Sequence, residues 1–357
     1  MSLIRHIEPA IANPITTARL SGLAHHLPEQ IVESAELDAR YEKPAGWLEG
    51  LCGVAARSVA SETDTQESMA VKAASAAIED AGIDPETIDL LLFGAAVGRQ
   101  PIPATAPLIK RELGLSHLAF PAYDVNATCL SALVAMDMAQ MQIALQRART
   151  VLVVTSEIAS RALPWDTDPK TAGLFGDGAA AMVLTTTNAM PPSSPQPGSG
   201  GLGLRLRHFQ METYAEAYDC CALASGGTRF DFHQDPGAFA DNAYFRMDGP
   251  ELFGLTATKL PDFLDRLLDG LGWTRQDVDL IIPHQASPLA LAHMARRSGF
   301  ARDRVFNQVS RTGNLVAASL PVALSCARME GRIQPGMKIL MIGTSAGVSL
   351  AGAGLES

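Results

Sequence analysis

Residues 123–133, YDVNATCLSAL, join an apolar, strand-like segment to a helix-compatible run that continues from Leu130 to about Gln146. The join predicts that Cys129 lies in the first turn of a helix. Unpaired backbone N–H groups and the positive end of the helix dipole lie at that position, and both favour a thiolate over a thiol. The position therefore predicts a lowered cysteine pKa and a reactive thiol. A buried structural cysteine fits these eleven residues equally well.

The composition is that of a globular chain with a large core. The 357 residues are 47% hydrophobic and 18% charged, with a net charge of −10. This length suggests two domain-sized units or one large α/β body. No basic stripe with interleaved aromatic residues is present, so we expect no nucleic-acid partner. We also expect a cytoplasmic protein with reduced thiols, no metal site and no membrane partner, because the chain shows no signal peptide, no bilayer-length apolar run and no metal-ligand cysteine spacing.

The pattern of apolar residues predicts strands alternating with helices, as in a parallel α/β sheet. Continuous apolar runs of strand length, typical of strands covered on both faces, lie at 88–97, 149–160 and 278–287. Helical periodicity lies between them, at 67–81, 251–270 and 288–298. A segment rich in Pro, Ser and Gly predicts a linker. We therefore expect an N-terminal extension (1–17), a first half (18–189), the linker (190–201) and a second half (202–357).

The two predicted halves resemble each other. AGIDPETIDLLLFGAA at 81–96 aligns with LGWTRQDVDLIIPHQA at 271–286, an offset of 190. VLVVTS aligns with ILMIGT at an offset of 188, and the turns at Cys129 and Asn314 correspond at an offset of 185. A near-constant offset predicts two βαβ-rich halves related by pseudo-symmetry. Loops at equivalent strand ends would then meet, at the edge where open α/β sheets bind ligands.

Three side chains at these strand ends and turns allow nucleophilic catalysis. Cys129 would be the attacking thiolate, and His284 would assist its deprotonation and then donate an N–H to a developing oxyanion. Asn314 supplies two amide donors and no charge. Taken singly, a histidine at a strand end is more often structural and a Gly-Asn turn is most often only a turn. The Gly-rich segment FGDGAAA (175–181) lacks the G-K-[ST] ending of a P-loop, so we reject a P-loop nucleoside triphosphatase.

The motifs, taken in order, resemble the thiolase superfamily, and most closely its β-ketoacyl-acyl-carrier-protein synthase III branch. The resemblance covers roughly residues 18–357. It rests on LPEQ (27–30), DVNATCLSAL (124–133), FGDGAAAMVL (175–184), FRMDGPELF (245–253), PHQAS (283–287), RTGNLVAASLPVAL (311–324) and GRIQPG (331–336) followed by the GTSAG loop (343–347).

The resemblance implies a five-layered α/β/α/β/α fold and a catalytic triad of Cys129, His284 and Asn314. It implies an oxyanion hole formed by the backbone N–H groups of Cys129 and Ala346. Members of the branch are cytoplasmic homodimers without a tightly bound cofactor. They load an acyl group from coenzyme A onto the cysteine and condense it with a malonyl thioester after decarboxylation. Coenzyme A and acyl carrier protein are therefore the expected partners.

The chain departs from the branch at positions that hold substrate. Trp47, which resembles a coenzyme A contact of the branch, is retained, but Leu51 stands where an arginine is expected. Lys170 stands near another expected arginine, so Arg57 and Lys170 become the candidate bases for the nucleotide, or the donor is presented on a carrier protein. Ile102 replaces the large aromatic residue of small-acyl enzymes and the glutamate of olefin-pathway relatives. It therefore predicts a roomier acyl pocket.

The leading hypothesis is a type III ketoacyl synthase, with specialised metabolism as one setting. The alternative within the family is an acyltransferase that passes the Cys129-bound acyl group to a hydroxyl, an amine or a carrier protein without decarboxylation. A cysteine hydrolase or amidase also uses Cys, His and Asn, but the ordered motifs and the repeat argue against it. A non-catalytic scaffold is disfavoured by the intact Cys–His–Asn set.

Overall fold

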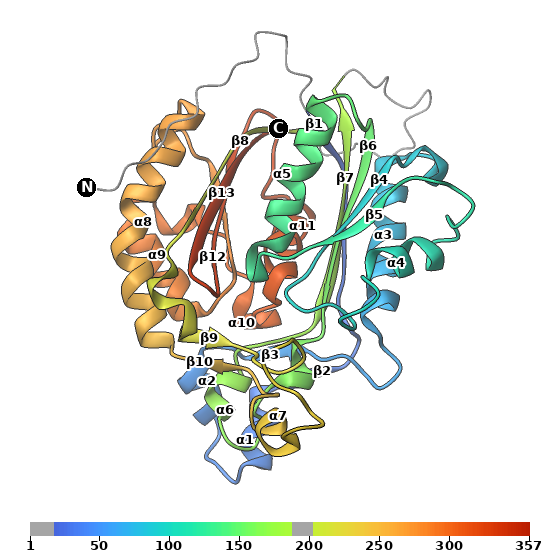
Figure 1. Cartoon of the computed structure of the whole chain (residues 1–357). Coiled ribbons are helices and arrows are strands. Elements are labelled where there is room, and N and C mark those ends of the chain that lie inside the picture. The colour runs from blue at the N-terminus through green and yellow to red at the C-terminus, as the bar shows by residue number, and fades with distance from the viewer. Residues whose placement is uncertain (1–17, 188–202) are drawn as a thin grey trace.

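The computed structural model describes residues 18–187 and 203–357, so the expected extension over 1–17 and the linker over 190–201 lie outside the described residues. The described chain forms layers (Figure 1). Helices α3 (Gln66–Ala81) and α4 (Ala106–Glu112) cover one outer face, and α8 (Gly249–Leu271) and α9 (Pro288–Ser298) cover the other. Two central helices lie between the strands of the two halves, which confirms the expected α/β/α/β/α architecture.

The first half alternates strands and helices as its apolar runs predict. The strand β6 (Thr150–Glu157) is buried along its whole length, as expected for a strand covered on both faces. The strands are β1 (Ala18–His26), β2 (Ile31–Glu33), β3 (Ala56–Ser58), β4 (Leu90–Gly94), β5 (Ala122–Val125), β6 (Thr150–Glu157) and β7 (Gly178–Thr186). The helices besides α3 and α4 are α1 (Ser34–Arg40), α2 (Trp47–Cys52), α5 (Ser131–Ala144) and α6 (Pro169–Ala172).

The second half repeats this order with a longer excursion after its first strand. The segment 213–248 contains a 3-10 helix, η4 (Ala215–Cys220), two short strands and one short α-helix. The strands of this half are β8 (Leu204–Thr213), β9 (Cys221–Ala222), β10 (Arg246–Met247), β11 (Leu280–Pro283), β12 (Lys338–Ser345) and β13 (Ser349–Glu356). The helices besides α8 and α9 are α7 (Pro236–Asp241), α10 (Val309–Thr312) and α11 (Ser319–Met329).

The main strands of both halves form one nine-stranded sheet in the order β11-β12-β13-β8-β1-β7-β6-β4-β5. The halves join where β1 pairs antiparallel with β8, through Arg19 with Arg205 and Leu20 with Leu204. On either side of this join the strands bend around the central helices α5 and α11, which lie between them in Figure 1. The sheet therefore continues from one half into the other.

Equivalent residues perform equivalent tasks in the two halves. The long outer helices α3 and α8 both end at a glycine with positive φ, Gly82 at 62° and Gly272 at 65°. An aspartate just before β4 and another before β11 then accept backbone N–H groups of the neighbouring strand. Asp89 Oδ2 lies 3.0 Å from the Thr150 nitrogen, and Asp279 Oδ2 lies 2.8 Å from the Lys338 nitrogen. The predicted pseudo-symmetry therefore extends to individual hydrogen bonds.

The turns that precede the two central helices also match, but in a different register from the one expected. Thr128 and Val316 both have φ of 52°, an uncommon value for β-branched residues, and each begins a short 3-10 turn. An asparagine two residues earlier, Asn126 or Asn314, accepts the N–H of that residue at 2.9 Å. The offset is 188, so Asn126 is the counterpart of Asn314. The expected offset of 185, which matched Asn314 with Cys129, is wrong.

Candidate active site

Cys129, the predicted nucleophile, lies in the turn η2 (Thr128–Leu130) immediately before α5, and we call η2 the nucleophile turn. The turn is held from both sides. Ser131 Oγ accepts the Ala127 N–H at 2.9 Å and donates to the Ala95 carbonyl at 3.1 Å. Thr128 Oγ1 donates to the Ala346 carbonyl at 3.3 Å. These bonds place Cys129 beside the loop between β12 and β13, in which Ala346 lies.

Cys129 is half-buried, next to the loop between β12 and β13. Burial, together with the charges of Glu157 and Cys221, raises the pKa of this thiol to about 12. Hydrogen bonds from the backbone N–H groups of Ala346 and of Cys129 itself act in the opposite direction. The lowered cysteine pKa expected from the sequence is therefore wrong. Both predicted oxyanion donors nevertheless lie at the sulfur atom.

The amide of Asn314 is oriented by its own turn, η6 (Val316–Ala318). Its Oδ1 accepts from the Val316 N–H at 2.9 Å and from Ser319 Oγ at 3.2 Å. Its backbone N–H donates to the Leu174 carbonyl at 2.7 Å, which attaches the turn to the FGDG segment. Because the oxygen is occupied, Nδ2 is the group left to donate to a ligand. The η6 and η2 turns contact each other, so the structure brings Asn314 to the nucleophile turn.

His284 lies directly after β11 and is 6% exposed. Burial lowers its pKa to about 4, so the imidazole is neutral at physiological pH. Gly343 on β12 lies between this histidine and the nucleophile turn. A Cβ at Gly343 would lie 2.9 Å from the His284 Cβ and 3.0 Å from the Leu130 Cδ2. A side chain at this position would therefore separate His284 from the turn of Cys129.

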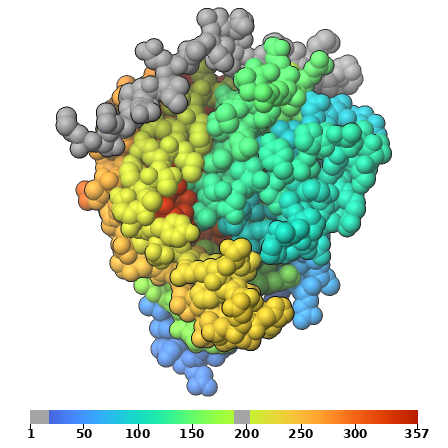
Figure 2. Space-filling view, viewed as in Figure 1, coloured from blue at the N-terminus to red at the C-terminus, as the bar shows by residue number. Residues whose placement is uncertain are grey.

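A cavity of about 80 Å³ lies beside His284, between α8 and α9. Its lining is mostly apolar and includes Phe253, Leu260, Met294 and Ile342. Within residues 18–187 and 203–357, three buried polar atoms of its lining have no hydrogen-bond partner: His284 Nδ1, Thr256 Oγ1 and His293 Nε2. The cavity can therefore receive a mainly apolar ligand with hydrogen-bonding groups along it. In Figure 2 a hollow lies between olive and green segments of the two halves, and its floor is formed by red residues near the C-terminus.

Arg57, expected to contact a substrate nucleotide, is fully buried in β3. Its Nη2 donates to Ser34 Oγ at 2.7 Å and to the Gly173 carbonyl at 3.0 Å, and its Nη1 donates to the Val32 carbonyl at 3.3 Å. These acceptors belong to the protein interior. Arg57 holds three segments of the chain together, and this placement contradicts the expected substrate contact.

Of the other expected substrate residues, Trp47 is half-buried, whereas Lys170 and Ile102 are exposed. Trp47 starts α2 and Lys170 lies on α6, and these two helices contact each other. The Trp47 ring lies edge-on to Tyr41 at 6.1 Å, and Lys43 Nζ lies 5.7 Å from its centroid. Ile102 lies on the loop between β4 and α4 and is 86% exposed. The structure therefore places Trp47 and Lys170 on neighbouring helices.

One residue of the site escaped the sequence reasoning. Glu157, the last residue of β6, is buried, and its charge acts on Cys129. Its only signal in the sequence is an acidic residue at the end of an apolar strand. Among the described residues no group of three or more His, Cys, Asp or Glu side chains is arranged to hold a metal ion. In the same part of the chain no helix is long and apolar enough to cross a membrane.

Comparison with known families agrees with this geometry. Residues 123–194 match the model of the 3-oxoacyl-[acyl-carrier-protein] synthase III family, and residues 268–357 match the model of its C-terminal part. The β-ketoacyl-[acyl-carrier-protein] synthase III of Coxiella burnetii is 32% identical over 96% of this chain and 100% of its own length. A Streptomyces coelicolor synthase III is also 32% identical, over 94% of this chain and 96% of its own.

Solved structures show the same fold. The crystal structure of 3-oxoacyl-(acyl carrier protein) synthase III from Pseudomonas aeruginosa superposes with a TM-score of 0.81 at 28% identity, over 95% of this chain and 98% of that chain. Xanthomonas campestris OleA, solved with bound lauric acid and lauroyl-CoA, gives a TM-score of 0.81 at 22% identity, over 96% and 100% of the two chains. At this level of sequence identity, the likeness to OleA supports the fold alone. By its sequence, its motifs and its two-half fold, the chain belongs to the β-ketoacyl-acyl-carrier-protein synthase III family.

Proposed function

We propose that the protein is a condensing acyltransferase of the EC 2.3.1 class that joins a Cys129-bound acyl group to a malonyl-type thioester. The observation that carries the proposal is the contact between two equivalent turns, one from each half of the chain. The η2 turn holds the Cys129 thiol, and the η6 turn holds the Asn314 amide. His284 follows β11 at the same end of the sheet. A thiol, a neutral imidazole and an oriented amide provide a nucleophile, a proton acceptor and an oxyanion donor.

In the first step the Cys129 thiol gives its proton to the neutral imidazole of His284, and the thiolate attacks the acyl thioester. The backbone N–H groups of Cys129 and Ala346 donate to the carbonyl oxygen as it becomes negative. The donor thiolate then leaves and takes a proton from His284. The acyl group remains on Cys129 as a new thioester.

In the second step the malonyl thioester loses carbon dioxide and forms an enolate. The N–H of His284 and the Nδ2 of Asn314 donate to the enolate oxygen. The enolate carbon attacks the acyl carbonyl on Cys129, the carbon–carbon bond forms, and Cys129 leaves as a thiolate. The step consumes neither an oxidant nor a metal ion, and it needs no resident cofactor.

The donor is a coenzyme A thioester, an acyl-carrier-protein thioester, or both. Trp47 and Lys170 lie on contacting helices and offer an aromatic face and a cation, which suit a nucleotide. The cavity between α8 and α9 leads to His284. Its Thr256 and His293 side chains can bond to the amides of the pantetheine chain that carries the thioester. Coenzyme A and carrier proteins share this chain.

The first test incubates the protein with acyl-coenzyme A donors of increasing length and measures the intact mass. The wild type should gain the mass of the acyl group, and the Cys129→Ala variant should not. An adduct that persists in Cys129→Ala, or none in the wild type with any donor, would remove Cys129 from its role. Cys326→Ala, which changes a thiol on α11, is the matched control and should be acylated normally.

The second test adds malonyl thioester to the acylated protein. Condensation should release carbon dioxide and yield a ketoacyl product in equal amounts. If the acyl group instead moves to an alcohol, an amine or a carrier protein without carbon dioxide, the protein is an acyltransferase. Asn314→Ala separates the steps, because it should retain the acyl adduct and lose the ketoacyl product.

A further inference from the structure

Glu157 carries a buried carboxyl group that lies between η2 and η6, the two turns of the site. It ends β6, and the residue is only 3% exposed. Its Oε1 accepts the Ala96 N–H at 2.6 Å, and the backbone N–H groups of Val97 and Ala317 also donate to the carboxyl. Ala96 and Val97 follow β4 in the first half, whereas Ala317 lies in η6 of the second half. One side chain therefore bonds to both halves.

A continuous series of hydrogen bonds connects Glu157 to the nucleophile. Ala96, whose N–H donates to Glu157, accepts the Asn126 Nδ2 at its own carbonyl, at 2.9 Å. The Asn126 Oδ1 in turn accepts the Thr128 N–H at 2.9 Å. Thr128 precedes Cys129 and holds the positive φ that shapes the turn. A displacement of Glu157 would therefore reach the backbone next to the thiol through three bonds.

On the other side the connection to the amide is shorter. Ala317 lies three residues after Asn314 in the same turn, and its N–H donates to Glu157. The position equivalent to Glu157 on β12, at an offset of 188, is Ser345, whose hydroxyl donates to the Ala346 carbonyl at 3.2 Å. The second half therefore has no matching carboxyl. The described site holds this single acidic clamp.

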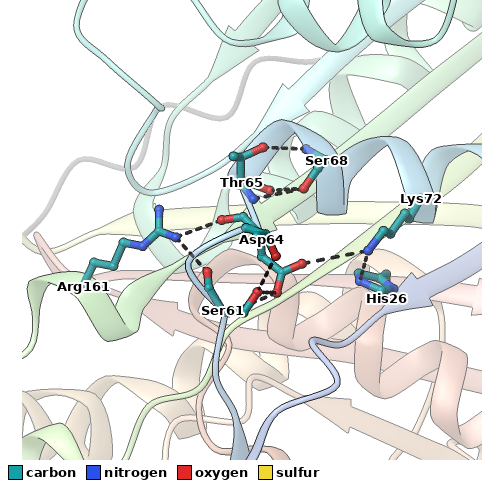
Figure 3. A network of polar contacts seen from close by, with 8 residues as sticks. His26, Ser61, Asp64, Thr65, Ser68, Lys72 and Arg161 are labelled. Carbon is teal, nitrogen blue, oxygen red and sulfur yellow. Dashed lines mark hydrogen bonds and ion pairs between the residues drawn. The ribbon is translucent and has the colours of Figure 1, made fainter.

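The start of α3, which contacts the backbone beside Glu157 through Gln66, is anchored by the polar contacts that Figure 3 shows from close by. Arg161 Nη2 donates to the Asp64 carbonyl at 2.8 Å, and Asp64 accepts from Ser61 Oγ at 2.8 Å. These contacts hold the start of α3. The first residue of α3, Gln66, then donates through Nε2 to the Val97 carbonyl at 2.7 Å and the Ser156 carbonyl at 2.8 Å. Both acceptors adjoin the bonds of Glu157.

We propose that Glu157 is the positioning residue that fixes the turn of Cys129 against the turn of Asn314, and that it must stay protonated while the Cys129 thiolate forms. A protonated carboxyl can hold the backbone N–H groups without placing a second negative charge beside the sulfur. Ionised, it would oppose the thiolate, because like charges in a buried site repel strongly. The inference uses the site of the proposed function, but it concerns thiol reactivity and does not depend on the condensation.

The electrostatic surroundings agree with this reading. Burial, with a smaller contribution from the nearby Asp177 carboxyl, raises the pKa of Glu157 to about 8, although the three backbone N–H groups that donate to the carboxyl lower it. Glu157 is thus mostly protonated at neutral pH. The charged and titratable groups that act on this pair are Asp177 on Glu157, and Glu157 and Cys221 on Cys129. None of them is a cation that would stabilise two negative charges together.

The test measures the pH dependence of Cys129 alkylation by iodoacetamide between pH 7 and 10, by intact mass and peptide mapping, with Cys129→Ala as the blank. Glu157→Gln keeps an acceptor for the Ala96 N–H but cannot ionise. It should be alkylated at least threefold faster than the wild type at pH 9 and equally fast at pH 7. Glu157→Ala removes the clamp, and its acyl-coenzyme A loading rate should fall at least tenfold at saturating donor.

Asp137→Asn is the matched control, because Asp137 is a half-buried carboxyl on α5 that does not hold either turn. It should leave alkylation and loading unchanged. The proposal is overturned if Glu157→Gln keeps the wild-type alkylation profile, or if folded Glu157→Ala is loaded at the wild-type rate. If Glu157→Ala does not fold, Glu157→Gln still decides. If the wild type forms no acyl adduct, the proposed function fails, while the alkylation result remains valid.

Discussion

A neutral histidine sets the acid side of the pH range in which this site can work. His284 is enclosed, and burial lowers its pKa to about 4. It can therefore accept the proton of Cys129 at any pH above about 5. Because the Cys129 pKa is raised to about 12, the thiol and not the imidazole controls how the rate changes toward alkaline pH. The pair starts as neutral thiol and neutral imidazole, so charge separates only when substrate is present.

The same histidine should make the fold sensitive to acid. In the unfolded chain a histidine takes up a proton near pH 6.5, whereas native His284 does so only near pH 4. Stability is therefore lost as the pH falls from about 6.5 to about 4, by roughly 3 kcal/mol in total from this residue. Thermal unfolding of wild type and His284→Asn at pH 7 and pH 4.5 checks this. The variant should lose clearly less stability between the two values, and equal losses would contradict the assignment.

The reactivity of Cys129 could be predicted from the sequence only in part. Its place before a helix and its partners His284 and Asn314 followed from strand ends and turns. The direction of its pKa did not. A helix dipole contributes up to about 2 kcal/mol, whereas full burial shifts a pKa by as much as about 3 to 5 units. Burial, and the approach of Glu157 from a strand 28 residues later, depend on tertiary packing that local sequence does not show.

At the scale of the elements, the closeness of β12 to η2 depends on a glycine. The Cβ of any side chain at Gly343 would lie closer to His284 and Leu130 than van der Waals contact allows. Gly343→Ala should therefore cost about 1 to 3 kcal/mol through overpacking. It should also lower acyl loading at least tenfold, because His284 moves relative to the nucleophile turn. Denaturant unfolding and intact-mass kinetics measure the two effects.

Gly254, inside α8, provides the contrasting substitution. A Cβ there meets no atom within 4 Å. Gly254→Ala should stabilise the protein by up to about 1 kcal/mol, because alanine is the better helix former, and loading should stay unchanged. Equal effects of the two glycine substitutions would show that close packing at Gly343 does not position the site.

The elements themselves were largely predictable. The apolar runs became β4, β6 and β11, and the capped periodic segments became α3 and α8. Boundaries were less so, since β4 spans only Leu90–Gly94 of the expected 88–97. The register of the two half-turns was missed because catalytic residues were matched with each other. The structural counterparts are the two asparagines, and only Asn314 was recognisable as functional from its motif.

At the scale of the whole molecule, β5 forms one end of the nine-stranded sheet and has no second neighbour within the described chain. Open strand edges pair readily with other strands. Two elements that contact β5 are β4 and α5, and large apolar side chains are exposed after β4, at Val97 and Ile102, and near the end of α5, at Met141 and Leu145. We propose that this face joins two copies of the chain. Ile102, the residue expected to widen the acyl pocket, would then lie at the interface.

Light scattering after size exclusion tests the assembly. The wild type should have about twice the chain mass of 37.8 kDa. Met141→Glu places a charge on the apolar face and should shift the protein toward the monomer, by at least tenfold in dissociation constant. Met329→Glu is the control, because Met329 is 76% exposed at the end of α11, on a different helix. A monomeric wild type, or the same shift in both variants, would refute the interface.

The pairing of β1 with β8 carries a consequence for how the protein can lose activity. The thiol belongs to one half of the chain and the amide to the other, and the sheet is continuous only through this short junction. Neither half contains a complete reaction centre. Separation of the halves would therefore silence the enzyme even if each kept its own secondary structure. Activity therefore requires the junction of β1 and β8 to be intact, and an activity assay reports whether the two halves are still joined.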